Sequence, residues 1–211
     1  MRDSENISSL LALKPDFIGF IFYEKSKRFV TEFPKVEIPS EIKKVGVFVN
    51  AKPDEVLKKV IDYQLDYVQL HGNETPEYCE HLQQSFPMHI GIASASHNVG
   101  IIKAFSIADD FDFGRTVPYQ DCCDYLLFDT KGKDYGGTGL KFNWELIKKY
   151  KGNTPYFLSG GIGLKDKNEL MSFSRAPEAN FCVAVDVNSR FETSPGIKNI
   201  EKLNEFKFNL L

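Results

Sequence analysis

The stretch DYLLFDT, residues 124–130, decides how the rest of the chain is interpreted. Four apolar or aromatic residues, Tyr125 to Phe128, lead directly to the carboxylate of Asp129, and a polar, glycine-rich segment follows at residues 131–139. Many α/β enzymes present a catalytic acid in this way, at the end of a buried parallel strand. An aspartate that only caps the turn after a strand gives the same pattern. The stretch by itself therefore leaves both interpretations open.

Other short apolar segments have the same character, and predicted helices separate them. Besides 124–128, we expect strands at residues 17–22, 44–50, 67–70, 101–105, 156–159 and 181–187. We expect helices at residues 3–13, 54–63, 75–86, 144–150, 164–172 and 196–206. Such alternation indicates parallel strands with crossover helices, and a spacing of about 20 to 35 residues is typical of βα units. The prediction is an α/β fold of the TIM (βα)8-barrel class, with residues 1–211 forming one domain.

The order of the elements departs from a complete barrel. An eight-stranded barrel begins with a strand, whereas this chain begins with a predicted helix and contains seven predicted strands. We therefore expect strand 1 of the barrel to be absent from this chain, which would leave unpaired edges on its two neighbours. An open seven-stranded sheet is the alternative. Residues 89–100 do not separate clearly into strand or loop.

The composition excludes several classes of protein. The 211 residues are 42% hydrophobic and 26% charged, with a net charge of −3 and no basic stripe, so we expect no nucleic-acid partner. No apolar run approaches the roughly 18 residues of a membrane span, and no signal peptide is evident, so we expect a cytoplasmic protein without a membrane partner. The four cysteines lack metal-ligand spacing and are interpreted as free thiols, with no metal site. The oligomeric state stays open.

Polar and small residues follow the predicted strands, where parallel α/β folds place their chemistry. The strand ends carry Arg28, His71, Asp129, Gly160, Gly161, Asp186, Asn188 and Ser189. The small residues after the last two strands offer backbone N–H groups, which favours a phosphate site there. Arg28 also fits a solvated basic loop, and His71 also fits an ordinary hydrogen-bonded strand end.

A set of short motifs makes the chain recognisable. In order they are DFIGFIF (16–22), SKR (26–28), VGVFVN (45–50), QLHG (69–72), LFDT (127–130), GGTG (136–139), SGG (159–161) and VDVNS (185–189). Together they resemble phosphoribosylanthranilate isomerases, the (βα)8 barrels of tryptophan biosynthesis. The resemblance runs from Met1 to about Leu203 and is weakest at residues 86–100.

The resemblance implies an Amadori rearrangement by acid–base catalysis without a cofactor. This reaction converts N-(5-phosphoribosyl)anthranilate to 1-(2-carboxyphenylamino)-1-deoxyribulose 5-phosphate, a small phosphorylated ligand. The resemblance implies that Asp129 is the general acid, that Arg28 faces the anthranilate carboxylate, and that His71 lies near the substrate. The residues that it implies for the phosphate are Gly160, Gly161, Asn188, Ser189 and Gly137.

One departure from the family pattern bears on activity. The family's general base is a cysteine on the first strand, and residues 1–7 look like the residues directly after it. None of Cys79, Cys122, Cys123 and Cys182 can replace it from its predicted position. We therefore expect this chain to be poorly active or inactive. The alternatives are a catalytically silent barrel that binds a phosphorylated ligand, and a barrel such as indole-glycerol-phosphate synthase, for which a strand-end catalytic lysine is not evident.

Overall fold

The computed structural model describes residues 1–89, 99–130 and 143–208. The α-helices are α1 (Ser4–Leu11), α2 (Pro53–Tyr63), α3 (Pro76–His89), α4 (Lys167–Ser174) and α5 (Ile200–Phe208). The short 3₁₀ helices are η1 (Phe113–Tyr119), η2 (Trp144–Lys149), η3 (Leu164–Asp166), η4 (Pro177–Phe181) and η5 (Ser189–Phe191). The strands are β1 (Phe17–Ile21), β2 (Lys43–Phe48), β3 (Tyr67–Leu70), β4 (Gly100–Ile107), β5 (Tyr125–Thr130), β6 (Tyr156–Leu158), β7 (Cys182–Val185), β8 (Glu192–Ser194) and β9 (Ile197–Lys198).

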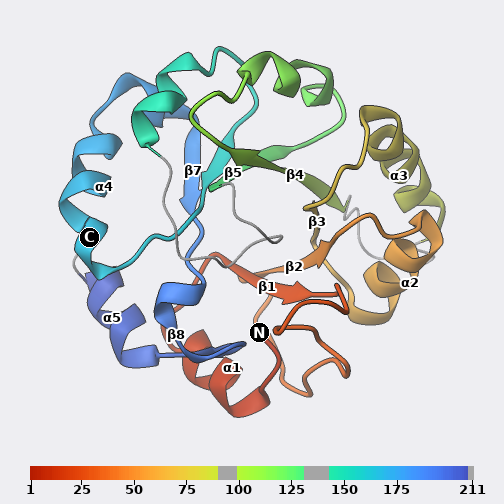
Figure 1. The fold of residues 1–211 in the computed structure, drawn as a ribbon. Helices are drawn as coiled ribbons and strands as arrows, with labels where there is room; N and C mark the ends of the chain where they lie inside the picture. Colours follow the sequence, from red (N-terminus) through yellow and green to blue (C-terminus); the bar gives the residue numbers. More distant parts are fainter. Residues whose placement is uncertain (90–98, 131–142, 209–211) are drawn as a thin grey trace.

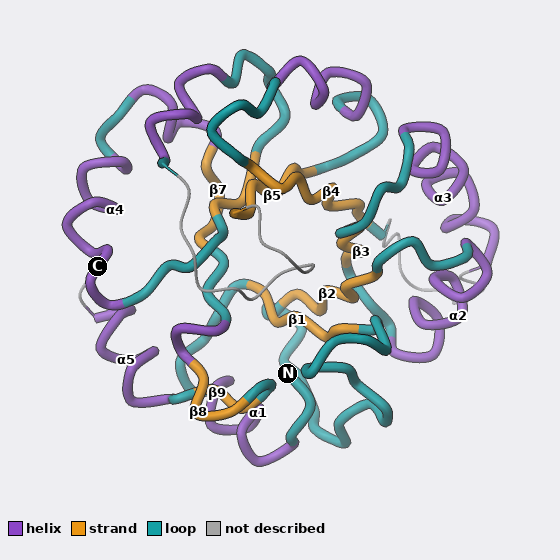
Figure 2. Tube along the Cα trace, viewed as in Figure 1, coloured by secondary structure: helices purple, strands orange, loops and turns teal. Residues whose placement is uncertain are grey.

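The strands β1 to β7 form one sheet in sequence order, and every neighbouring pair is parallel. The sheet curves around an interior, and the helices lie on its outer side (Figures 1 and 2). This is the wall of a TIM-type barrel, and it confirms the predicted fold class. Within the described ranges, β1 and β7 are the two ends of the strand order.

The pleat of the strands decides which residues face the interior. Side chains alternate between the two faces of a strand, so Leu127 and Asp129 share one face of β5 while Phe128 takes the other. Leu127 packs in a small inner cluster with Ala104 and Phe157 from the neighbouring strands. Phe128 instead contacts the ring of Tyr150, which follows the outer helix η2. Asp129 therefore points into the interior of the barrel.

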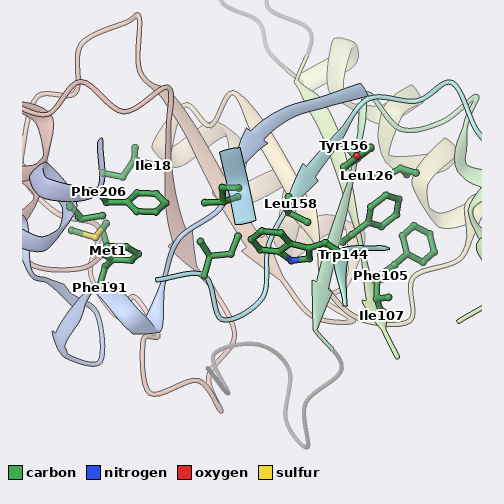
Figure 3. Close-up of a cluster of buried hydrophobic side chains, with 14 of the residues drawn as sticks. Met1, Ile18, Phe105, Ile107, Leu126, Trp144, Tyr156, Leu158, Phe191 and Phe206 are labelled. Carbon is green, nitrogen blue, oxygen red and sulfur yellow. The ribbon is translucent and has the colours of Figure 1, made fainter. Parts of the chain in front are cut away.

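The main hydrophobic core lies between the outer face of the sheet and the surrounding helices. Figure 3 shows part of it, with Leu126, Tyr156 and Leu158 from the strands beside Trp144 from η2. These four side chains are at most 3% exposed. Burial of large apolar side chains contributes roughly 1.5–3 kcal/mol each. This core fixes the strands whose ends carry the polar residues.

Two of the predicted helices take a different form. Residues 144–149 form the 3₁₀ helix η2 rather than an α-helix. The helix predicted from residue 196 begins only at Ile200, because residues 192–198 form the antiparallel hairpin β8–β9. Gly196, with φ of +88°, makes its turn, a conformation that glycine adopts without strain. The hairpin sets Glu192 opposite Lys198, which matters for the site.

The other predicted elements agree with the structure. The Asp3 carboxylate accepts a hydrogen bond from the Asn6 N–H at 2.7 Å, which caps α1 at the start of the predicted helix 3–13. β4 covers the predicted strand 101–105. Most of the ambiguous segment 89–100 lies outside the described residues. In the part of the chain that the structure describes, the helices are too short or too polar to cross a bilayer.

Candidate active site

A cavity of about 1240 Å³ extends from the carboxyl ends of the strands through the interior to Asp16 and Phe17 at the start of β1. It collects residues that lie far apart in the sequence because each follows a different parallel strand. Of the predicted site residues, those that line it are Arg28, His71, Asp129, Gly160, Gly161, Asn188 and Ser189. Gly137 lies outside the described residues. The strand-end residues that the sequence analysis grouped therefore lie together around one cavity.

Asp129 is the most enclosed carboxylate that the sequence singled out. It occupies the fifth position of β5 and is 7% exposed. Its Oδ1 accepts a hydrogen bond from the N–H of Thr130 at 2.8 Å. This bond holds the carboxylate in one orientation and leaves Oδ2 directed at His71. A buried carboxyl with one fixed oxygen is suited to the transfer of a proton at a defined position.

His71 follows β3 and lies directly beside Asp129 in the cavity wall. Its Nε2 lies 3.4 Å from Asp129 Oδ2, and its Nδ1 lies 2.8 Å from Nε2 of Gln69. An amide nitrogen only donates, so Nδ1 accepts and the ring proton sits on Nε2. Gln69 and His71 share one face of the strand, two residues apart. Gln69 therefore selects the tautomer that presents an N–H to Asp129.

Arg28 lies in the connection after β1 and is paired. Its Nε and Nη2 contact the carboxylate of Glu192 at 2.9 and 2.6 Å. Lys198 lies 3.5 Å from Glu192 Oε1, an oxygen that Arg28 Nε also contacts, and its Nζ donates to Asn188 Oδ1 at 2.7 Å. Burial alone would raise the pKa of Glu192, but the Arg28 hydrogen bonds and the charge of Lys198 outweigh it and lower that pKa. Burial lowers the pKa of Lys198, against the opposing effect of Glu192.

Asp186 is a second carboxylate on the cavity wall. Its Oδ2 accepts a hydrogen bond from Ser159 Oγ at 2.9 Å. Burial raises the pKa of Asp186, and the charge of Asp129 adds to this; Ser159, Lys198 and His71 act in the opposite direction. The charge of Asp129 is therefore part of the electrostatic environment of Asp186. Low-dielectric surroundings of this kind favour the protonated form of an acid.

The glycine pair after β6 forms one edge of the cavity. Gly160 and Gly161 have φ values of +95° and +63°, which glycine adopts readily. A Cβ on Gly160 would lie 2.2 Å from Thr130 Oγ1, so this loop packs closely against the residue after Asp129. Asn188 and Ser189, at the start of η5, line the same cavity. Backbone N–H groups from two loops therefore come near one edge.

Three cavity residues were missed in the sequence. Gln69, Glu192 and Lys198 all line the cavity and hold the predicted residues in place. Gln69 could have been found, because it lies two residues before His71 on the same strand face. Glu192 and Lys198 could not be found, because their hairpin is marked only by the turn at Pro195-Gly196. That turn was interpreted as the start of the helix predicted at residues 196–206.

A neighbouring ion pair lies on the other face of the sheet. Lys103, in β4, contacts Glu74 at 3.0 Å and also donates to the carbonyl oxygens of Leu70 and Gly72 at 3.1 and 2.8 Å. Glu74 accepts from the N–H groups of Asn50 and Gly72 as well. Lys103 does not line the main cavity. Lys103 therefore does not support the alternative of a barrel such as indole-glycerol-phosphate synthase, which would need a catalytic lysine at a strand end.

The match to known proteins agrees with this geometry. A family model described as N-(5'phosphoribosyl)anthranilate (PRA) isomerase matches residues 1–208. The chain belongs to the PRA isomerase family. The PRA isomerase of Parabacteroides distasonis is 43% identical over 211 aligned residues, which cover 98% of this chain and 88% of that protein. That of Phocaeicola vulgatus is 37% identical over 206 residues, covering 98% and 92%.

Solved PRA isomerase structures share the fold. The isomerase from Thermotoga maritima has a TM-score of 0.76 and 29% identity, over 100% of this chain and 95% of that one. A PRA isomerase in complex with reduced 1-(O-carboxyphenylamino)-1-deoxyribulose 5-phosphate has a TM-score of 0.72 and 27% identity, over 100% and 98%. These comparisons do not support the expected absence of strand 1.

Proposed function

We propose that this chain converts N-(5-phosphoribosyl)anthranilate to 1-(2-carboxyphenylamino)-1-deoxyribulose 5-phosphate in tryptophan biosynthesis. The observation that carries the proposal is the buried Asp129 carboxyl, facing His71 in a large strand-end cavity of a PRA isomerase family member. The reaction is an internal proton redistribution of an aminoaldose. It needs an acid at the ring oxygen and a base at C2. We propose that it takes place in the cytoplasm, in one barrel domain formed by residues 1–211.

Asp129 is our proposed general acid. Its proton passes to the ribose ring oxygen as the C1–O bond opens, which gives an iminium ion at C1. Loss of the C2 proton then gives the enolamine, which tautomerises to the aminoketone. The Thr130 N–H fixes one carboxyl oxygen and the His71 N–H faces the other, so the carboxyl has a defined direction. His71 is proposed to lie beside the substrate and to stabilise the carboxylate after proton transfer.

Arg28 is our proposed contact for the anthranilate carboxylate. A guanidinium has five N–H donors, and Glu192 engages those on Nε and Nη2. The donors on Nη1 can meet a second carboxylate without loss of this pair. Glu192 therefore acts as a positioning residue, because it fixes the plane of the guanidinium. Lys198 adds positive charge to the same side of the cavity.

The phosphate is proposed to sit on the loops after β6 and β7. Gly160 and Gly161 supply close-packed backbone, and Asn188 and Ser189 supply backbone and side-chain donors. The Lys198 ammonium, 2.7 Å from Asn188 Oδ1, brings a cation to this edge. Backbone N–H groups with a nearby cation favour a phosphate dianion. The family resemblance also implies Gly137 for this group, and that assignment stays a proposal.

The base for the C2 proton is the open part of the mechanism. His71 does not fit, because its Nδ1 already accepts from Gln69 and its Nε2 carries the proton. The described residues that line the cavity include no cysteine, although the family resemblance assigns the base to a cysteine. This observation favours a second candidate function, a barrel that binds the phosphorylated ligand without turning it over.

Turnover of N-(5-phosphoribosyl)anthranilate, generated in the assay, separates the two functions. We expect slow product formation, which Asp129→Asn should lower by a further factor of about 10² to 10⁴ and Asp124→Asn should retain. Asp124 is a matched control because it lies at the other end of the same strand, where its carboxylate caps the Ile101 N–H at 2.8 Å away from the cavity. Binding of the product analogue without turnover in the unmodified chain would establish the silent barrel. If the unmodified chain shows no binding and no turnover, both functions are rejected.

A further inference from the structure

Three of the four cysteines meet in a hydrophobic core that includes residues of α3, and none of the three lines the main cavity. Cys79 lies on α3, while Cys122 and Cys123 lie in the turn between η1 and β5. Their sulfur atoms all lie within 4.8 Å of one another, and the residues are 0%, 1% and 7% exposed. Sequence spacing gave no hint of this cluster, since α3 and the turn are brought together only by the fold.

We propose that Cys79, Cys122 and Cys123 form a three-sulfur site for a soft, thiophilic cation of the Cu(I) class. Thiolate sulfur selects such ions over hard cations. A metal ion about 2.3 Å from each of three sulfurs, the usual metal–thiolate distance for zinc, holds the sulfurs about 4 Å apart. The cluster is therefore already near the separation that a bound ion requires. On binding, each coordinating thiol releases its proton and donates a lone pair to the cation.

The number of sulfurs decides the class of ion. Among the described residues, the group contains no fourth ligand of the histidine, cysteine, aspartate or glutamate type. Structural zinc sites almost always have four protein ligands, so Zn²⁺ fits this group less well than an ion that accepts three thiolates. The cluster is also embedded in a hydrophobic core with Leu82 and Phe86, which keeps water from completing the coordination of a harder ion.

The surroundings hold the sulfurs in place. Cys122 Sγ lies 3.9 Å from the Pro118 oxygen and 3.7 Å from the Tyr119 oxygen, contacts in which the thiol donates weakly. The turn carrying both adjacent cysteines is therefore anchored before any ion binds. The competing interpretation is that the three thiols only fill space in the core, as buried cysteines commonly do. It predicts no defined metal stoichiometry.

Copper binding to the intact chain tests the proposal. Cu(I) is supplied anaerobically with a reductant and a competing Cu(I) chelator, and the bound metal is measured after separation of the protein. We expect one copper per chain, and a loss of affinity of about 100-fold for Cys79→Ser and for Cys123→Ser. Cys182→Ser is the matched control, because this fourth cysteine lies at the start of β7, where its thiol donates to the Ala184 oxygen at 3.6 Å. It should bind copper as the unmodified chain does.

Equal copper affinity of the cluster variants and the unmodified chain would overturn the proposal. So would loss of binding in Cys182→Ser alone. If a cluster variant does not fold, X-ray absorption at the copper edge of the unmodified protein answers the question. Three sulfur neighbours support the site, and a first shell of nitrogen or oxygen rejects it. The cluster shares no residue with the cavity, so these results do not depend on turnover.

Discussion

Two pairs of opposite charge lie at the same edge of the barrel wall, and their surroundings differ. Lys103 and Glu74 have side chains that are 3% and 1% exposed, and backbone groups complete the hydrogen bonding of both. Arg28 and Glu192 are 16% and 5% exposed and open onto the large cavity. Backbone groups occupy the remaining hydrogen-bonding positions of the first pair, whereas the second pair faces the large cavity and can share its donors with a ligand.

The difference comes from the direction in which each side chain leaves the sheet. Ala104 packs in the inner cluster, so its neighbour Lys103 points to the opposite face of β4. Arg28 instead lies in a connection after its strand, over the mouth of the cavity. We therefore expect the Arg28 pair to act in substrate binding and the Lys103 pair to act in stability. Four predictions test this distinction, in order of decreasing effect.

The largest effect is expected from Asp129→Asn, which alters the inner face alone. The amide cannot donate a carboxyl proton, so kcat should fall by about 10²- to 10⁴-fold. Steady-state turnover measures this loss. The thermal midpoint should stay close to that of the unmodified chain, because the asparagine oxygen can still accept from the Thr130 N–H. A variant that keeps its turnover would remove Asp129 from the acid role.

Lys103→Met should lower the stability of the protein and leave its turnover nearly unchanged, the opposite of Asp129→Asn. It leaves the Glu74 carboxylate buried without its cationic partner, which typically costs about 3–5 kcal/mol of unfolding free energy. Urea unfolding measures the loss, and turnover per folded molecule should change little. Arg28→Met serves as the matched control, since its pair faces the cavity and water can replace the lost contact. If Arg28→Met destabilised the protein as much as Lys103→Met, the contrast between the pairs would be wrong.

Arg28→Lys tests whether the Arg28 guanidinium binds the substrate carboxylate. Lysine keeps the charge but cannot hold Glu192 and a substrate carboxylate with one planar group. Loss of one hydrogen bond to a charged group is worth about 1.5–3 kcal/mol, so KM should rise by roughly 10-fold or more. The expected kcat is nearly unchanged, because Arg28 does not transfer the proton. A lower kcat with an unaltered KM would assign Arg28 to the chemical step instead.

The smallest effect concerns the pH dependence of stability at Asp186. Burial raises the pKa of this carboxyl in the folded state, so the folded chain binds more protons than the unfolded chain above the ordinary pKa of aspartate. Its contribution to stability therefore decreases as the pH rises from the ordinary value through the raised one. Asp186→Asn removes this dependence.

Urea midpoints at several pH values between about 4 and 8 measure the effect of Asp186→Asn. The variant should gain stability relative to the unmodified chain as the pH rises, with the change complete above the raised pKa. Ser159→Ala is a useful companion, because it removes the hydrogen bond that opposes the shift. A difference between variant and unmodified chain that is constant with pH would show that Asp186 does not titrate as described.

Much of the fold could be predicted because it depends on local patterns. The apolar runs at 124–128 and 156–159 form β5 and β6. The hairpin β8–β9 was not predicted, since its strands are only three and two residues long. Such strands carry no periodic signal. Their pairing depends on the turn at Pro195-Gly196, which was interpreted as the start of a helix.

The grouping of the strand-end residues came from one geometric rule, that parallel strands end at the same edge, and the family resemblance supplied their roles. The rule placed Arg28, His71 and Asp129 together, and the cavity contains all three. It could not supply the partners that orient them. Gln69 sets the tautomer of His71, and Glu192 reaches Arg28 from a segment 164 positions away in the sequence.

The sequence by itself determined the family, the alternation of strands and helices, and the residues at the strand ends, because these depend on residue identity and short-range order. Tertiary structure alone decided which charges face the cavity, which partner each one holds, and that three distant cysteines share one buried cluster. The physical reason is that pairing of side chains depends on distances across the fold. Periodicity along the chain carries no information about those distances.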